Sequence, residues 1–68
     1  MKIQFFKIHE DRSEYIYGID SPVIYPKRGD KITLEIKGNN EKFKVKYVMI
    51  DYKNNAYQIF VIPLTKTT

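Results

Sequence analysis

The chain has 68 residues, no cysteine and no tryptophan, and its 12 lysines and arginines against 8 acidic residues give a formal net charge of +4. A chain this short forms one small domain. Without cysteine it has neither a disulfide nor a thiolate metal site, so apolar packing must hold the core. The hydrophobic fraction of 43% and the charged fraction of 29% exclude intrinsic disorder. We therefore expect a single folded domain over residues 1–68.

The N-terminal segment, residues 1–12, mixes polar with apolar residues and is unlike the apolar region of a signal peptide. No part of the chain approaches the run of about 18 apolar residues that crosses a bilayer. We therefore expect a cytoplasmic protein without a membrane partner. Short, cysteine-free chains enriched in Ile, Lys, Tyr and Asn, which AT-rich codons encode, are common among phage and mobile-element accessory proteins that inhibit or adapt a host machine.

The first half of the chain predicts two strands, at residues 2–8 and 14–19, separated by the polar loop of residues 9–13. Two prolines then bracket residues 23–24. Because proline cannot donate to a sheet, this short extended piece is kept out of any central strand.

The clearest strand is residues 31–37, in which apolar side chains alternate with polar ones. Residues 38–41 favour a turn, and residues 42–52 resume the alternation. We predict a hairpin with Asn39-Asn40 at its tip. The facing pairs of this register are Ile36–Phe43, Leu34–Val45 and Ile32–Tyr47. The predicted core is centred on Ile32, Leu34, Ile36, Phe43 and Val45.

A second hairpin is predicted between residues 42–52 and 57–64, with Asn54-Asn55 at its tip. Its register pairs Met49 with Phe60 and Ile50 with Ile59. One side continues the first apolar face with Met49, Phe60, Ile62 and Leu64. The alternation then leaves a second apolar set on the opposite side, consisting of Val48, Ile50, Tyr52, Tyr57, Ile59 and Val61.

Two interpretations of this second apolar set remain open. An exposed surface of this composition is typical of a contact with a protein partner or a second copy of the chain. Alternatively, a β-bulge near Val48 shifts the phase of the strand and turns Ile50 into the core beside Phe5 or Tyr15. Because a small barrel has little interior and the first half of the chain brings many apolar residues, we favour the protein interface.

The whole pattern predicts an all-β domain of about five strands that curl into a small open barrel. No apolar period of 3.6 residues runs for three turns, and β-branched and aromatic residues dominate every predicted strand. Residues 26–34, Pro-Lys-Arg-Gly-Asp-Lys-Ile-Thr-Leu, resemble the turn into a strand of small barrels of the Src-homology-3 type, including KOW-containing domains. The resemblance implies that Gly29 supplies an unusual backbone angle and that Asp30 ties the turn to its own backbone. The glycine pair that follows this strand in a KOW motif is absent, so the resemblance implies the barrel alone.

Positive charge is concentrated in the second half of the chain. Residues 27–68 carry nine lysines and arginines against four acidic residues, whereas residues 1–26 carry three against four. Five lysines of the first hairpin could contact phosphates without base specificity, namely Lys31, Lys37, Lys42, Lys44 and Lys46. No aromatic residue stands within this stripe in the predicted register, and lysine also protects strand edges from aggregation. Nucleic-acid binding is therefore the alternative to protein contact.

No arrangement of residues indicates catalysis, a metal or a cofactor. His9, Asp11 and Ser13 are neighbours on a polar loop, without the burial that holds a catalytic base against its nucleophile. The acidic residues nearby lack the spacing of a calcium loop. We expect a non-enzymatic binding module with no cofactor. Its expected partner is a protein or a second copy of the chain, with nucleic acid as the alternative and a small ligand in the barrel mouth as a third reading.

Overall fold

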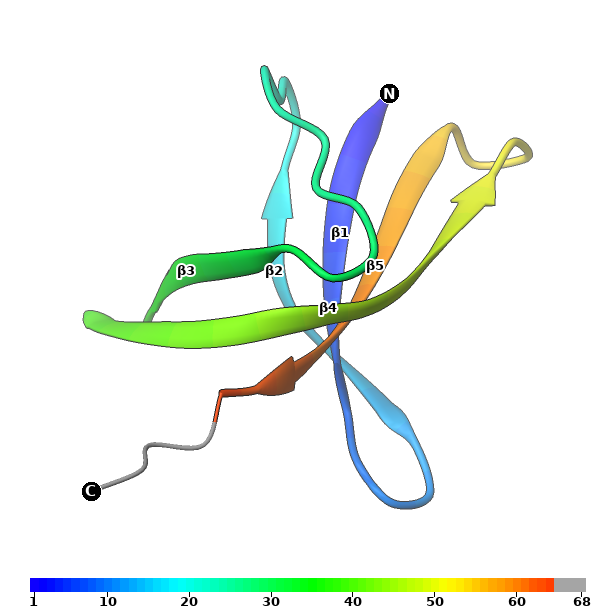
Figure 1. Cartoon of the computed structure of the whole chain (residues 1–68). Coiled ribbons are helices and arrows are strands. Elements are labelled where there is room, and N and C mark those ends of the chain that lie inside the picture. Colours follow the sequence, from blue (N-terminus) through cyan, green and yellow to red (C-terminus); the bar gives the residue numbers. More distant parts are fainter. Residues whose placement is uncertain (65–68) are drawn as a thin grey trace.

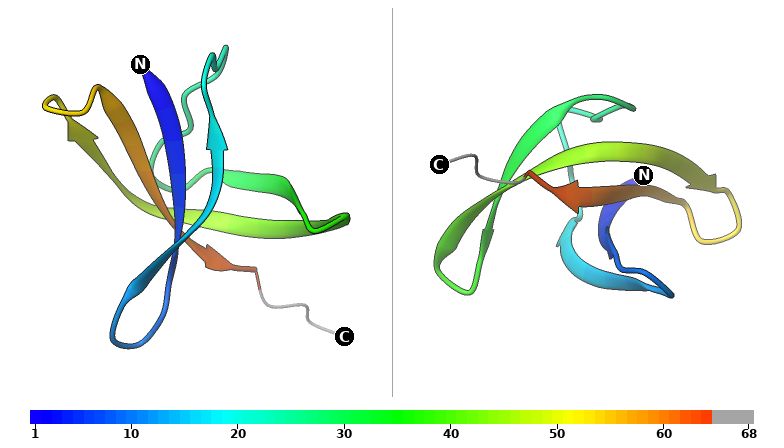
Figure 2. Two further views of the ribbon diagram at one scale, coloured as in Figure 1. Left: turned by 180° about the vertical axis from the view of Figure 1, so that it is seen from behind. Right: turned by 60° about the horizontal axis from the view of Figure 1, so that its bottom comes forward.

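The computed structural model describes residues 1–64, which form five strands and no helix (Figure 1). The strands are β1 Lys2–Ile8, β2 Ser13–Ile19, β3 Lys31–Ile36, β4 Asn39–Asp51 and β5 Ala56–Pro63. They join in one sheet in the order β2-β1-β5-β4-β3, in which β1 and β5 run parallel and the other neighbours run antiparallel. The sheet curls into an open half-barrel (Figure 2). The predicted all-β class and open, curled sheet of five strands are thereby confirmed.

Residues 20–30 connect the two edge strands, β2 and β3, and cover one end of the half-barrel (Figure 1). Pro26 is buried there, and its carbonyl accepts a 3.1 Å hydrogen bond from the Tyr57 hydroxyl. The Tyr25 ring packs edge-on against the Tyr57 ring, with 5.2 Å between centroids, and the Tyr25 hydroxyl donates to the Met1 carbonyl. The segment is therefore fixed to β5 and to the start of the chain, although it contains no strand.

The core lies inside the curl of the sheet and joins the first strand of the chain to the last three. Its buried side chains are Ile3 and Phe5 of β1, Leu34 of β3, Phe43 and Val45 of β4, and Ile59 and Val61 of β5. Ile32 and Ile36 of β3 pack against this cluster. The five core residues predicted from the first hairpin are therefore confirmed.

The β3–β4 turn is formed by Lys37 and Gly38, whose φ angles are +52° and +82°. A two-residue turn with positive φ at both positions matches the twist of its strands, and glycine adopts such an angle without strain. Asn39 and Asn40 lie in β4 instead of at the tip, so the predicted register is wrong. The facing pairs are Ile32–Phe43, Leu34–Glu41 and Ile36–Asn39. Each partner moves by an even number of residues, so this displacement by itself moves no side chain to the other face of the sheet.

The β4–β5 turn spans residues 52–55, and Asp51 faces Ala56 across its base. The predicted tip, Asn54-Asn55, lies within this turn, where Asn55 has a φ of +54°. The observed pairs include Met49–Gln58 and Ile50–Tyr57, so the predicted register is displaced by two residues. This displacement is also even, so by itself it moves no side chain to the other face of the sheet.

Two β-bulges decide which side chains face the core. In β4 the register shifts between Val45 and Tyr47, so that Lys46 is the extra residue and Val48 turns toward the core. In β2 the corresponding shift makes Ile16 the extra residue. Because a bulge changes the phase of the alternation, the predicted bulge near Val48 is confirmed. Its predicted consequence for Ile50 is wrong: Ile50 pairs with Tyr57 and stays 48% exposed instead of entering the core beside Phe5 or Tyr15. The side chains moved from predicted core positions to the outer face include Tyr47, Met49, Phe60 and Ile62.

Candidate functional site: the outer face of the sheet

The six residues of the predicted protein interface are divided between the core and the surface. Ile59 and Val61 are completely buried, and Val48 and Tyr57 are half-buried against the core. Only Ile50 and Tyr52 are exposed, by 48% and 83%. The set does not form one surface, because the bulge in β4 places Val61 opposite the buried Val45. The expectation of a continuous apolar face is therefore corrected.

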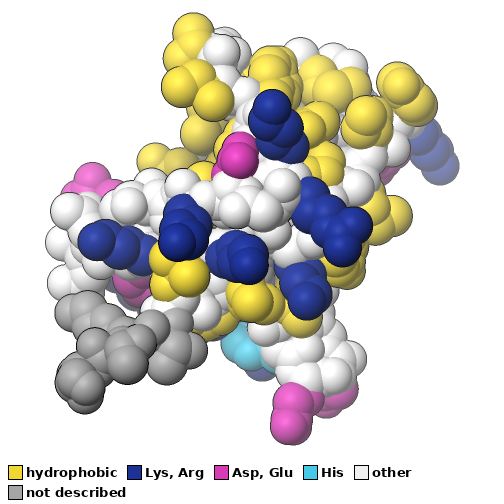
Figure 3. Space-filling view, viewed as in Figure 1, with side chains coloured by type: hydrophobic (Ala, Val, Ile, Leu, Met, Phe, Trp, Pro, Cys, Tyr) yellow, Lys and Arg dark blue, Asp and Glu magenta, His cyan; other side chains and the backbone are white. Residues whose placement is uncertain are grey.

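Exposed apolar side chains gather instead at the end of the half-barrel where the N-terminus lies (top of Figure 3). We call the exposed apolar residues of this end the apolar rim; they lie on two segments on opposite sides of it, with Val23, Ile24 and Tyr25 in the β2–β3 connection and Ile50 and Tyr52 on the β4–β5 hairpin (Figure 1). Tyr25 and Ile50 both neighbour Tyr57, through the ring contact and the strand pairing respectively. Val23 is 95% exposed. The sequence signal for this exposure is the pair of prolines that keeps residues 23–24 out of the sheet.

The predicted phosphate-binding lysines are all exposed, and most of them share one face. Lys31 of β3 and Lys42 and Lys44 of β4 project outward, because their strand neighbours point into the core. Lys46 is the bulged residue next to them, whereas Lys37 lies in the turn and belongs to neither face. Basic side chains gather along the part of the surface that carries β3 and β4, with apolar atoms between them (Figure 3).

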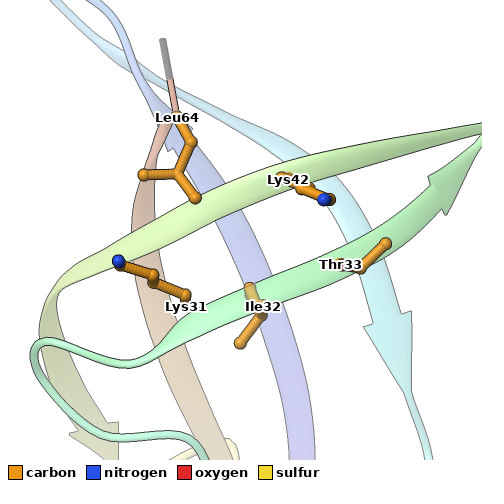
Figure 4. A pocket seen from close by; sticks show the side chains of 5 residues that line it. All are labelled: Lys31, Ile32, Thr33, Lys42 and Leu64. Atoms are coloured by element: carbon orange, nitrogen blue, oxygen red, sulfur yellow. The ribbon is translucent and has the colours of Figure 1, made fainter. Parts of the chain in front are cut away.

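Lys31 and Lys44 are directly opposite each other in the β3–β4 ladder. Within residues 1–64, the one ion pair shorter than 4.0 Å joins His9 and Glu14, so none of these lysines is paired with a carboxylate there. A pocket of about 330 Å³ opens between the Lys31 and Lys42 side chains, with Thr33 and Leu64 in its wall (Figure 4). In Figure 4 the Lys31 and Lys42 side chains point in opposite directions, so their ammonium groups do not converge on one anion in this pocket.

An aromatic row runs across four strands of the outer face and begins beside these lysines. Tyr47 of β4 stacks on Phe60 of β5 with 4.7 Å between centroids and 18° between planes. Phe60 stacks on Phe6 of β1 at 5.1 Å and 17°, and Phe6 meets Tyr15 of β2 edge-on at 5.7 Å. Only the inward-facing pair Val45–Val61 lies between the pair Tyr47–Phe60 and the pair Lys44–Ile62 in the β4–β5 ladder. The lysines and the aromatic row therefore form one continuous surface.

Both ends of the aromatic row depend on the bulges. Unbroken alternation would put Tyr47 on the same side as Val45, and Tyr15 on the same side as Tyr17, which packs against the core. The extra residues Lys46 and Ile16 reverse this phase, so both tyrosines lie outside. At the Tyr15 end, Gly18 leaves room for the Tyr15 ring, because a side chain at position 18 would collide with its hydroxyl. This row was not predicted from the sequence, because the predicted registers placed Tyr47 and Phe60 inside.

The turn before β3 adds further positive charge along the edge of β4 that faces away from β5. Gly29 has a φ of +93°, and the Asp30 carboxylate accepts a 3.0 Å hydrogen bond from the Lys27 amide, which agrees with both roles that the resemblance implied. The turn is fixed to β4 by hydrogen bonds from the Gly29 amide to the Val45 carbonyl and from the Val45 amide to the Asp30 carbonyl. Lys27 and Arg28, both exposed, are therefore held beside the bulge.

The remaining candidates from the sequence form no comparable group. His9 shares a 2.9 Å hydrogen bond with Glu14, which is the main cause of the lowered pKa of the Glu14 carboxyl. Residues 1–64 hold no cluster of three or more His, Asp or Glu side chains arranged as metal ligands. Over the same residues there is no helix with the length and apolar character needed to cross a bilayer.

Comparisons of the chain with protein-family models, with curated proteins and with solved structures found no match. The outer face and the apolar rim are therefore the features of the molecule that bear on function.

Proposed function

We propose that the chain is a non-enzymatic module that binds nucleic acid through phosphate contacts on the outer face of the β3–β4 hairpin. The observation that carries this proposal is the like-charge pair Lys31–Lys44, which has no carboxylate within ion-pair distance in residues 1–64. Like charges directly opposite each other destabilise a hairpin. A polyanion that contacts both ammonium groups removes this repulsion and gains affinity by releasing its own counterions.

Protection of a strand edge against aggregation does not account for these lysines. Lys44 lies on an inner strand, with Lys31 on one side and Ile62 on the other. Lys42 is likewise flanked by Thr33 of β3 and by Leu64, whose amide donates to the Lys42 carbonyl. Neither lysine stands at an open edge, so their position is better explained by a ligand on the face of the sheet.

The test is the salt dependence of binding to short DNA and RNA probes, measured for the wild type and for Lys44→Glu. About three phosphate contacts predict that the logarithm of the affinity falls with the logarithm of the salt concentration with a slope of about −2 to −3. Lys44→Glu should weaken binding and reduce this slope by about 1. It should also raise the melting temperature, because it places an opposite charge across from Lys31.

Lys53→Glu is the matched control, since Lys53 lies in the β4–β5 turn and the change in net charge is the same. It should leave the slope nearly unchanged. The proposal is wrong if the wild type binds neither DNA nor RNA at about 50 mM salt, or if both variants weaken binding equally.

Contact with a protein through the apolar rim is the second candidate function. The observation that favours it is the exposure of Val23, Ile24 and Tyr52 at one end of a small domain, because clustered exposed apolar side chains are typical of protein interfaces. A second copy of the chain is the simplest partner to test. Light scattering should show a mass that rises with concentration for the wild type and stays that of a monomer for Ile50→Lys. A monomeric wild type at every concentration contradicts self-association.

A further inference from the structure

Tyr47 is the last ring of a three-ring stack, and among residues 1–64 Phe60 is the one ring that stacks on it. Phe60 covers the face toward β5, and Phe6 continues the stack beyond it. On the other side β3 begins only at Lys31, opposite Lys44, so the turn of residues 27–30, which is hydrogen-bonded to Val45, borders β4 there in place of a strand. The side chain is 42% exposed. A partly exposed aromatic ring thus ends a preformed stack, and we call the side of the ring away from Phe60 its open face.

Positive charge lies around this open face. Lys44 and Lys46 precede Tyr47 on β4, and the turn that carries Lys27 and Arg28 is hydrogen-bonded to Val45. The acidic group of this turn, Asp30, is engaged by the Lys27 amide. A planar, apolar surface bordered by several cations complements a nucleotide, which combines a flat base with a phosphate.

We propose that the preferred ligand is single-stranded nucleic acid, with one base stacked on the open face of Tyr47 and the adjoining phosphates contacting Lys44 and Lys46. This proposal rests on the proposed function and names its substrate class. A duplex presents its phosphates but keeps its bases stacked inside, whereas a single strand can place a base against a side chain. Single-stranded DNA and RNA both offer a base and phosphates, so matched oligothymidylate and oligouridylate probes show which of the two the protein prefers.

The experiment compares four probes of equal length: oligothymidylate, oligouridylate, an abasic single strand and a DNA duplex. Fluorescence anisotropy of labelled probes at low salt gives the affinity of each protein variant. The abasic strand keeps the phosphates and lacks the bases, so it separates stacking from charge. The variants are Tyr47→Ala, Tyr47→Phe and Tyr15→Ala. Tyr15 is the matched control, because it is an exposed tyrosine that also contacts a phenylalanine but lies at the far end of the row.

The wild type should bind at least one of the two base-carrying single strands about tenfold more tightly than the abasic strand. Tyr47→Ala should remove this preference and leave the affinity for the abasic strand unchanged. Tyr47→Phe keeps an aromatic ring and should keep the preference, and Tyr15→Ala should change affinity less than twofold. The proposal of base stacking is wrong if the wild type binds the abasic strand as tightly as the base-carrying strands, or if it prefers the duplex. It is also wrong if Tyr47→Ala binds the base-carrying strands as tightly as the wild type does. None of these results would contradict the phosphate contacts. No binding of any probe would overturn the proposed function as well.

Loss of the Tyr47–Phe60 contact could unfold Tyr47→Ala, so a second variant keeps the proposal testable. Tyr47→Trp retains a stacked ring and introduces the single tryptophan of the chain. Its emission should be quenched by the base-carrying strand that binds more tightly and not by the abasic strand. Emission that is unchanged when that strand is fully bound would show that no base stacks at this position.

Discussion

Asp51 fixes the β4–β5 turn through its carboxylate. One oxygen accepts a 3.2 Å hydrogen bond from the Asn54 amide, and the other accepts a 2.8 Å hydrogen bond from the Asn54 side chain. The hydrogen bond from the side chain is the largest cause of the lowered pKa of Asp51, and the backbone bonds and the charge of Lys2 act in the same direction. These contacts favour the ionised carboxyl in the folded state.

The lowered pKa predicts how the stability of the turn depends on pH. A carboxyl whose pKa is lower in the folded state than its ordinary value of 3.8 stabilises the fold above that value. The contribution is lost as the pH falls through the folded pKa, because both states are then protonated. Urea unfolding should therefore show Asp51→Ala less stable than the wild type at pH 7, with a difference that shrinks below about pH 4. Asp11→Ala, in the exposed β1–β2 loop, is the control and should show little difference at either pH. A difference for Asp51→Ala that stays constant down to pH 2 would contradict this role.

At the scale of the strand, alternation identified the elements but not their registers. The strand predicted at residues 31–37 differs from β3 by only one residue because its alternation is unbroken, and β1 was predicted at residues 2–8 although Phe5-Phe6 interrupts its alternation. The β3–β4 turn was misplaced because the prediction put Asn39 and Asn40 at its tip. The two residues with positive φ are Lys37 and Gly38, and a turn of this type favours glycine at its second position. The core prediction survived this error, since an even displacement keeps each side chain on its face.

The bulge at Lys46 marks the limit of prediction for the candidate site. The sequence shows that alternation fails near residue 48, and a bulge was one of two explanations. Its position depends on which side chains of β5 pair with β4, and no local pattern contains that information. The parallel pairing of β1 with β5 brings Phe6 beside Phe60, although 54 residues separate them in the chain. The lysine half of the site could be predicted from the sequence, whereas the aromatic half required the tertiary fold.

At the scale of the whole molecule, a small set of buried side chains holds all five strands. β1 and β5 contribute four of the seven core residues, and β3 contributes Leu34 alone. β3 is also an edge strand, hydrogen-bonded to β4 on one side only. The attachment of β3 to the sheet, which holds Lys31 opposite Lys44, therefore depends strongly on how well Leu34 packs against the rest of the core.

This dependence predicts a large difference between two neighbouring residues of β3. Leu34→Ala removes a buried side chain and should cost about 2 to 5 kcal/mol. A chain of 68 residues has a total stability of about 3 to 10 kcal/mol, so this loss is a large part of the whole. Thr33→Ala changes an exposed side chain opposite Lys42 and should cost less than about 1 kcal/mol. Thermal unfolding followed by far-ultraviolet circular dichroism measures both variants. Similar melting temperatures would contradict the assignment of Leu34 to the core and, with it, its role in attaching β3 to the sheet.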